Sequence, residues 1–399
     1  MFEYIEKFKK LGFGLFIHFG LYSVEGKGEW YKHMYSVPDE QYESLINKFN
    51  VKKNWAKKLV SLAKKAGCKY ITLTVRHHDG FSLFDTCGLN DYDAPHSKTG
   101  RDLVKEFVEA CREGEILPMF YHTLLDWREK SYRENFPAYI DYLVESIKIL
   151  CTNYGKIGGF WFDGMWDKKD EDWQEDRIYG TIRQYQPDAM IINNTGLSAL
   201  GKVGHPEIDS VTFERGKPTA YVDNNDKPRA GEMCQVVNDH WGYAQNDINY
   251  KSVRELIGNL IDCRKYGCNF LLNIGPKGSG DIRAFDKCIL EEIGKWIKLN
   301  KNFIYEAQPC DICLENADVV TDGKYFYAVA RDVGMSADPN VGLQNENNWI
   351  KSPYKIKLAK WLDNDMPARL DESGYSVFVE PFGYGISYIN RVVKLEFYQ

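Results

Sequence analysis

The chain has 399 residues and a net charge of −6, with 44% hydrophobic and 27% charged residues. This length exceeds one small domain and fits a barrel of about 250 residues followed by a second domain of about 100. Because the sequence has no long basic run, we expect no nucleic-acid partner and no anionic membrane surface. The sequence leaves open whether the chain forms an oligomer.

The N-terminus and the cysteines predict a cytoplasmic protein. The opening segment MFEYIEKFKK is polar and unlike a signal peptide, and no apolar run is long enough to cross a membrane. A signal peptide removed beforehand would leave no trace here. Several of the ten cysteines lie in apolar runs, where a thiol packs as a small hydrophobe, and the single CxxC at Cys310 and Cys313 lacks a second pair for a zinc ribbon. We therefore expect mostly reduced cysteines.

Short apolar runs alternate with amphipathic stretches along the first 300 residues. This alternation is typical of βα units, and eight units fit a closed (β/α)₈ TIM-like barrel. The predicted strands are Phe13–His18, Tyr70–Val75, Leu117–Tyr121, Gly159–Asp163, Ala189–Asn193, Ser210–Glu214, Glu232–Val237 and Asn269–Ile274. Helical periodicity marks Trp55–Ala66, Leu103–Arg112, Tyr139–Tyr154, Arg177–Tyr185, Val253–Lys265 and Ala284–Leu299.

The pattern changes after Asn300, where strand-like runs are separated by clusters of Gly, Asp, Asn and Pro and no convincing helix follows. Such a pattern predicts a C-terminal antiparallel β-sandwich. We therefore expect a catalytic barrel over residues 1–300 and a β-sandwich domain over residues 301–399. The predicted strands of this second domain are Tyr325–Arg331, Tyr354–Lys360, Tyr375–Val379 and Val392–Phe397.

Polar residues close nearly every predicted barrel strand, and in a TIM barrel the chemistry lies at these C-terminal ends. Single polar residues there are often solvated loop starts, but a ring of His, Asp, Glu and Asn at one mouth indicates an active site. The residues are His18, His77, His78, Asp79, Tyr121, His122, Trp161, Asp163, Asn193, Asn194, Glu214 and Asn273.

Asp163 is the strongest candidate for a nucleophile. Residues two apart on a strand share a face, so Trp161 and Asp163 should both point into the barrel mouth. An indole offers a flat apolar wall for a sugar ring, and the carboxylate can attack the anomeric carbon. The alternative is that Asp163 caps the following turn.

A glycosidase needs a second carboxyl group, which in retaining enzymes lies about 5–5.5 Å from the first. Glu214, at the end of the sixth predicted strand, can face Asp163 across the mouth. Glu232, in the seventh, is the rival acid/base. Either glutamate has a structural alternative, in which it pairs with Arg215 or Arg229.

Four histidines, His18, His77, His78 and His122, are expected at the same mouth. They could donate hydrogen bonds to sugar hydroxyls or ligate a metal. The first strand offers one histidine rather than an HxH pair, and no HExxH motif occurs. We therefore favour hydroxyl binding and expect no metal and no cofactor.

Seven motifs follow one another across nearly all of the first 300 residues. They are GLFIHFGLYSV, GEWY, KYITLTVRHHDGFSLFD, FYHTLLDW, GFWFDG, EMCQVVNDHWGY and NFLLNIGPKGSGDI. Together, and in this order, they resemble the α-L-fucosidases of glycoside hydrolase family 29.

The resemblance implies a (β/α)₈-like barrel with a C-terminal β-sandwich, which removes α-L-fucosyl residues from oligosaccharides or glycoconjugates with retention and without a metal. It assigns the nucleophile to Asp163, and Trp161 is a plausible apolar wall for the fucose methyl group. The residues that would bind the sugar are His18, Glu29, Trp30, His77, His78, Tyr121 and Trp161.

The acid/base residue is the poorly shared part of this family. Its usual place after the sixth strand favours Glu214, whereas Glu232 matches a tryptophan–glutamate pair of the family in which Gly231 here replaces the tryptophan. The segment after Asn193 lacks an arginine that many members carry, and Phe19 and Phe84 replace common tryptophans. Two other classes stay open, a metal-dependent hydrolase and a sugar-binding protein without catalysis.

Overall fold

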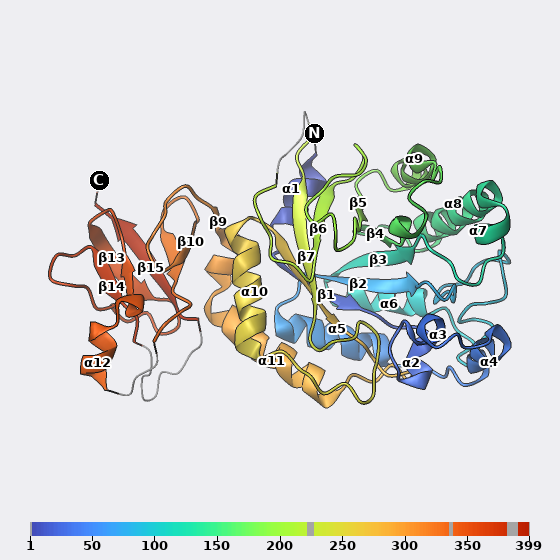
Figure 1. Cartoon of the computed structure of the whole chain (residues 1–399), viewed down its shortest axis with the longest axis horizontal. Coiled ribbons are helices and arrows are strands. Elements are labelled where there is room, and N and C mark those ends of the chain that lie inside the picture. Colours follow the sequence, from blue (N-terminus) through green and yellow to red (C-terminus); the bar gives the residue numbers. More distant parts are fainter. Residues whose placement is uncertain (1, 222–226, 335–337, 381–389, 399) are drawn as a thin grey trace. The chain divides into compact units, whose positions relative to one another are not determined.

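Eight parallel strands form a closed barrel in the computed structural model, which describes residues 2–221, 227–334, 338–380 and 390–398. The strands follow chain order around the barrel, and β1 pairs with β8 to close it (Figure 1). All eight predicted strands are present, so the predicted barrel is confirmed. The strands are β1 (Phe13–Ile17), β2 (Tyr70–Arg76), β3 (Leu117–Thr123), β4 (Gly159–Asp163), β5 (Met190–Asn193), β6 (Ser210–Glu214), β7 (Ala230–Val236) and β8 (Asn269–Ile274).

Helices lie in the connections β1–β2, β2–β3, β3–β4, β4–β5 and β7–β8, and each of the six predicted helices is present. The long ones are α5 (Trp55–Ala66), α6 (Leu103–Glu113), α8 (Phe136–Asn153), α9 (Glu175–Tyr185), α10 (Val253–Lys265) and α11 (Ala284–Leu299). The short ones are α1 (Glu3–Lys9), α2 (Tyr22–Glu25), α3 (Tyr31–Met34), α4 (Asp39–Glu43), η1 (Ser44–Asn47), α7 (Ser131–Glu134), η2 (Met165–Lys168) and η3 (Asn302–Glu306).

Side-chain caps fix where three of the long helices begin. Asp102 precedes α6, Asn135 precedes α8 and Ser252 precedes α10, and each side chain accepts a hydrogen bond from the backbone N–H three residues further on. Such a cap satisfies one of the N–H groups that have no partner inside the helix and stabilises it by about 1 kcal/mol.

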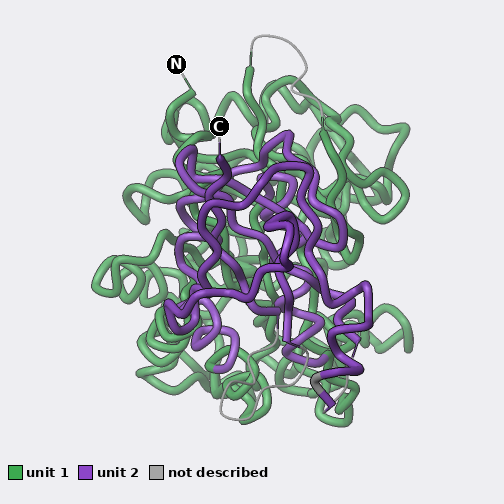
Figure 2. Tube along the Cα trace, turned by 90° about the vertical axis from the view of Figure 1, so that its left-hand side faces the viewer, with its two compact units in different colours: residues 1–251, 269–291 green, residues 252–268, 292–399 purple. Residues whose placement is uncertain are grey.

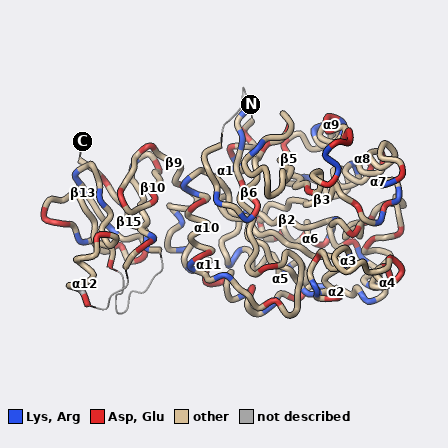
Figure 3. Tube along the Cα trace, viewed as in Figure 1, with Lys and Arg blue, Asp and Glu red and all other residues tan. Residues whose placement is uncertain are grey.

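The barrel strands are almost entirely buried, as expected for parallel strands covered by helices on the outside and filled by side chains on the inside. The strands carry few charges, whereas Lys, Arg, Asp and Glu are mixed along the outer helices (Figure 3). At the N-terminal end of the barrel, Ile5 and Phe8 of α1 pack against Tyr70 and Met119 in one apolar cluster. Apolar side chains therefore fill the barrel interior at this end.

The C-terminal residues form an antiparallel β-sandwich, as predicted, with a five-stranded sheet in the order β13-β15-β11-β10-β9 and a two-stranded sheet of β12 and β14. Its core contains Val393, Leu395, Ile350 and Val377, which come from both sheets. The strands are β9 (Gln308–Pro309), β10 (Asp318–Thr321), β11 (Phe326–Val329), β12 (Trp349–Lys351), β13 (Ile356–Trp361), β14 (Ser376–Phe378) and β15 (Val392–Phe397).

Helical elements in this region were not expected: besides η3, the structure has α12 and the short 3₁₀ helix η4 (Glu346–Asn348). The helix α12 (Pro339–Gln344) has six residues and begins after Asp338, whose side chain accepts a hydrogen bond from the Asn340 N–H. The expectation that no helix follows Asn300 is therefore wrong. Six residues are fewer than two helical turns, too short for a hydrophobic period to show in the sequence.

The chain packs as two compact units, shown in green and purple in Figure 2. One comprises residues 1–251 and 269–291, and the other comprises residues 252–268 and 292–399. The helix α10 therefore groups with the sandwich, and α11 passes from one unit to the other. Among the described residues, no helix combines the length and the apolar character needed to span a membrane.

Candidate active site

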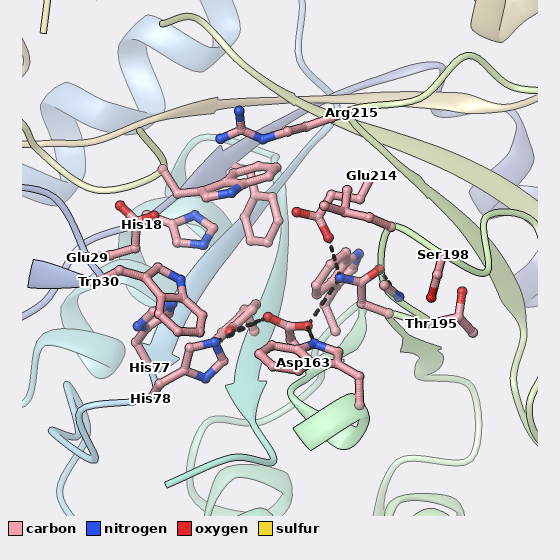
Figure 4. Close-up of a pocket in the computed structure, with 18 of the residues that line it drawn as sticks. His18, Glu29, Trp30, His77, His78, Asp163, Thr195, Ser198, Glu214 and Arg215 are labelled. Atoms are coloured by element: carbon pink, nitrogen blue, oxygen red, sulfur yellow. Dashed lines mark hydrogen bonds and ion pairs between the residues drawn. The ribbon is translucent and has the colours of Figure 1, made fainter. Parts of the chain in front are cut away.

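A cavity of about 590 Å³ opens at the C-terminal ends of the barrel strands (Figure 4). All its lining residues belong to the first compact unit. In the view of Figure 4, His18, His77 and His78 lie to one side of Asp163, and Glu214 lies to the other. The lining residues are Phe16, His18, Glu29, Trp30, His77, His78, Tyr121, Trp161, Asp163, Trp166, Lys169, Asn194, Thr195, Gly196, Leu197, Ser198, Glu214, Arg215 and Trp241.

Asp163 ends strand β4, and the chain turns away directly after it. Gly164 has a φ of +101°, and a Cβ atom there would lie 2.6 Å from Leu125 Cβ and 2.7 Å from Leu125 N. Only glycine fits this close approach and this backbone conformation without strain. The tight turn leaves the Asp163 side chain at the strand tip, 16% exposed to the cavity.

Three hydrogen-bond donors and the ring of His78 surround the Asp163 carboxylate. Tyr121 Oη donates to Oδ2 at 3.1 Å, and Trp166 Nε1 and Asn194 Nδ2 each donate to Oδ1 at 3.1 Å. His78 Nε2 lies 3.5 Å from Oδ2. Burial raises the pKa of Asp163, but the contacts with His78, Trp166 and Asn194 outweigh it and leave the pKa below its usual value. The group is therefore kept ionised.

The hydrogen bonds of His78 orient its ring toward Asp163. Its Nδ1 lies 2.7 Å from Thr123 Oγ1, and the Thr123 hydroxyl in turn donates to the Leu125 carbonyl. The threonine oxygen can therefore only accept, so His78 Nδ1 carries a hydrogen.

Glu214 and Asp163 are hydrogen-bonded to the same side-chain amide, that of Asn194. Asn194 Nδ2 donates to Glu214 Oε2 at 2.7 Å and to Asp163 Oδ1 at 3.1 Å, so these two oxygens lie less than about 6 Å apart. Retaining glycosidases hold their carboxyl pair at about 5–5.5 Å. Burial, followed by the negative charge of Asp163, raises the pKa of Glu214. The pair therefore combines an ionised carboxylate with a neighbour that keeps its proton to higher pH.

The Asn194 amide is fixed in this orientation. Its Oδ1 accepts from Thr212 Oγ1 at 3.2 Å and from the Gly196 N–H at 3.2 Å, which directs the NH₂ group toward the two carboxylates. Directly after Glu214, Arg215 adopts a left-handed backbone with a φ of +52°, which is uncommon for a residue other than glycine.

The histidine at the tip of β1 presents a lone pair to the cavity. Asn273 Nδ2 donates to the Trp241 carbonyl at 2.7 Å, so its Oδ1, 2.6 Å from His18 Nδ1, accepts the hydrogen of that ring nitrogen. Burial lowers the pKa of His18 to about 3, against the opposing effect of its bond to Asn273. His18 is therefore neutral, and its Nε2 is an acceptor for a hydroxyl of the ligand.

The structure places the other predicted sugar-binding residues around the same cavity. Glu29 accepts a hydrogen bond from the Gly242 N–H at 2.7 Å. Trp30 stacks on Trp166 with ring centroids 6.1 Å apart. Burial, followed by the neighbouring histidines, lowers the pKa of His77 well below its usual value, so this ring is neutral. All seven residues line the cavity, namely His18, Glu29, Trp30, His77, His78, Tyr121 and Trp161.

Glu232 does not line the cavity. Strand β7 pairs with β6 so that Cys234 lies beside Glu214 and Glu232 lies beside Thr212. Glu232 is thus two residues deeper in the barrel, roughly 6.6 Å along the strand. Its side chain is 1% exposed and contacts Tyr70 and Trp161 beneath the cavity floor.

The expectation for His122 is wrong, because this side chain points out of the barrel. Successive residues of a strand face opposite sides. Since Tyr121 faces the interior, His122 faces α8, where its Nε2 lies 2.8 Å from Ser146 Oγ. The residue is fully buried there and does not belong to the cavity.

Several lining residues were not among the expected site residues. Trp166 lies in η2 just after β4, Trp241 and Lys169 lie in loops, and residues 195–198 follow β5. In the GFWFDGMW segment, Trp166 lies three residues after Asp163, and this closeness in sequence could have marked Trp166 as a site residue. Within the described residues, no group of three or more His, Cys, Asp or Glu side chains is arranged to hold a metal ion.

A barrel with two carboxyl groups this close together in a cavity of histidines and indoles defines a glycoside hydrolase. The family model described as Alpha-L-fucosidase matches residues 3–302. The chain therefore belongs to the α-L-fucosidase family, glycoside hydrolase family 29.

Individual relatives agree with this assignment. The human tissue α-L-fucosidase is 27% identical over 337 residues, which cover 76% of this chain and 69% of the relative. Among solved structures, α-L-fucosidase isoenzyme 1 from Paenibacillus thiaminolyticus has a TM-score of 0.86 and 29% identity, and the match covers 100% of this chain and 99% of that one. AlfC from Lactobacillus casei, solved with its α-L-fucose product, has a TM-score of 0.65 and 25% identity over 75% of this chain and 99% of that one.

Proposed function

We propose that the protein is a retaining exo-glycosidase that removes terminal α-L-fucosyl residues from glycans or glycoconjugates, with Asp163 as nucleophile and Glu214 as acid/base. One observation carries this proposal: Asn194 joins the two carboxyl groups across the cavity, with their oxygens less than about 6 Å apart. The opposite directions of their pKa shifts support distinct roles.

The first step forms a glycosyl ester. An Asp163 oxygen attacks C1 of the fucosyl residue while the bond from C1 to the leaving oxygen breaks, and the Glu214 proton passes to that oxygen. In the second step, Glu214 removes a proton from water, the water oxygen attacks C1, and Asp163 leaves as a carboxylate. Two inversions give net retention, and both groups return to their initial protonation states.

The cavity offers groups suited to the fucosyl residue. The neutral His18 accepts a hydrogen bond from a sugar hydroxyl through Nε2, and Glu29 offers a carboxyl oxygen on the same side. Fucose carries a methyl group in place of a hydroxymethyl group, and Phe16 and Trp161 supply an apolar surface for it. The α-L-fucose bound to AlfC from Lactobacillus casei supports this choice of sugar.

The position of Glu232 favours Glu214 as the acid/base. A proton donor must reach the leaving oxygen directly or through one water. Glu214 lines the cavity next to Asp163, whereas both oxygens of Glu232 are engaged by Tyr70 and Trp161 below it.

The proposal is tested by following hydrolysis of para-nitrophenyl α-L-fucoside by proton NMR, beside a panel of para-nitrophenyl glycosides that differ only in the sugar. We expect turnover of the α-L-fucoside alone or with strong preference, and the α anomer of fucose as the first product. Appearance of the β anomer first would contradict retention, and hydrolysis of another sugar in preference to the fucoside would contradict the substrate.

A further inference from the structure

The carboxyl group of Glu232 is buried in the barrel interior among apolar side chains. It is 1% exposed, and its partners Tyr70 and Trp161 belong to an apolar cluster that also contains Phe16, Met119 and Leu271. In the part of the chain that the structure describes, no Lys, Arg or His forms an ion pair with it. Burying a carboxyl group in such surroundings is unfavourable unless both of its oxygens are hydrogen-bonded.

Each oxygen of Glu232 accepts one hydrogen bond from an aromatic residue of another strand. Tyr70 Oη on β2 donates to Oε2 at 2.5 Å, and Trp161 Nε1 on β4 donates to Oε1 at 2.9 Å. With both oxygens engaged, the carboxyl group cannot rotate. The indole N–H, whose burial would be unfavourable without an acceptor, is held at one defined place.

The indole held by Glu232 forms part of the sugar site. Trp161 lines the cavity and stacks on Tyr121 with ring centroids 5.7 Å apart and an interplanar angle of 20°. Tyr121 in turn donates its hydroxyl hydrogen to Asp163 Oδ2. A rotation of the indole would therefore move both the apolar wall of the cavity and the ring that carries a donor to the nucleophile.

We propose that Glu232 is a positioning residue that acts through Trp161: its carboxyl group fixes the indole plane against which the sugar binds and on which Tyr121 stacks. This inference rests on the proposed function, because it concerns the same sugar site. It gives Glu232 no contact with the substrate and no proton transfer to it. Burial raises the pKa of Glu232 to about 7, against the opposing effect of the hydrogen bonds from Tyr70 and Trp161.

Two substitutions separate the hydrogen bond from the volume of the side chain. Glu232→Gln keeps the shape and an oxygen that can accept from Trp161, whereas Glu232→Leu keeps a similar volume and removes the acceptor. We expect Glu232→Leu to lower kcat/KM by about tenfold or more, mostly through KM, and Glu232→Gln to stay within about threefold of the wild type. The loss should be equal for good and poor leaving groups, because no proton transfer is affected.

A second readout does not depend on catalysis. In protein labelled with fluorotryptophan, the fluorine NMR signal of Trp161, assigned with Trp161→Phe, should shift or broaden in Glu232→Leu and stay near its wild-type position in Glu232→Gln. Inactivity of the wild-type protein would defeat the proposed function and leave this spectroscopic comparison intact. An unchanged Trp161 signal in Glu232→Leu would defeat the positioning role alone.

The kinetic results give further ways to overturn the inference. Wild-type KM and kcat in a folded Glu232→Leu variant would contradict it, as would an equal loss in Glu232→Gln. A loss confined to poor leaving groups would make Glu232 the acid/base instead. If Glu232→Leu does not fold, Tyr70→Phe takes its place, because it removes the second bond that stops the carboxyl group from rotating. A KM raised about threefold supports the inference, and an unchanged KM contradicts it.

Discussion

The side-chain amide of Asn194 binds both carboxyl groups of the site, Asp163 Oδ1 at 3.1 Å and Glu214 Oε2 at 2.7 Å. One NH₂ group therefore stabilises the ionised form of each and lowers both pKa values. The nucleophile benefits from this effect. In Glu214 the same hydrogen bond opposes burial and the negative charge of Asp163. These two effects are larger, so the pKa of Glu214 stays above its usual value.

Removal of this amide should move the whole pH profile. In Asn194→Ala both carboxyl groups lose a donor, so both pKa values rise. The acidic limb of kcat/KM, which reports ionisation of Asp163, and the alkaline limb, which reports loss of the Glu214 proton, should both shift to higher pH. We also expect kcat/KM at the optimum to fall by about tenfold.

The neighbouring Asn193 provides the matched control. Its Nδ2 donates to Tyr179 Oη outside the cavity, so Asn193→Ala should leave both limbs in place. Limbs that stay fixed in Asn194→Ala, or that move apart, would show that this amide does not bridge the pair.

Glu214→Ala should impair poor leaving groups more than good ones. A leaving oxygen that departs easily as an anion needs little protonation, whereas an alcohol needs a full proton. General acid catalysis contributes about 10²–10⁴-fold, so we expect at least a 100-fold loss on a fucosyl disaccharide and a much smaller loss of the first step with dinitrophenyl fucoside. The measurement is kcat/KM across a series of leaving groups. The same dependence in Glu232→Ala, with none in Glu214→Ala, would exchange the two assignments.

The sequence could predict which strand residues face the barrel interior, because side chains on a strand alternate between its two faces. Trp161 and Asp163 share a face by this rule, and both line the cavity. The same rule applied to Tyr121 turns His122 outward, although its place at a strand end had suggested otherwise.

Depth within the barrel could not be predicted, because it depends on the register between neighbouring strands. Glu232 and Glu214 both face inward, but the pairing of Glu214 with Cys234 places Glu232 below the cavity. Trp241 and the loop after Asn194 depend on loop geometry, which no periodic pattern encodes.

The buried Glu232 should make stability depend on pH. Burial raises its pKa from the ordinary 4.5 to about 7. Because the folded protein holds this proton more tightly than the unfolded chain, the stabilisation is complete below about pH 4.5 and is lost as the pH rises through about 7. The titratable groups that face it are Tyr70, which donates to it, and Cys234, whose pKa is raised by burial so that the thiol stays neutral.

This dependence can be measured by denaturant unfolding of the wild type and Glu232→Gln at several pH values. Relative to the variant, the wild type should lose up to roughly 3 kcal/mol of unfolding free energy between about pH 4.5 and pH 8. Parallel curves for the two proteins would mean that Glu232 does not titrate in this range.

The role of Asp163 as nucleophile is tested most directly by Asp163→Gly with and without azide. Asp167→Gly is the control, because Asp167 binds Tyr132 and does not line the cavity. We expect Asp163→Gly to lose turnover of para-nitrophenyl α-L-fucoside, and azide to restore part of it by attacking C1 from the vacated side, with β-L-fucosyl azide as the product seen by NMR and mass spectrometry. Wild-type turnover in Asp163→Gly without azide, with no azide adduct, would contradict the account.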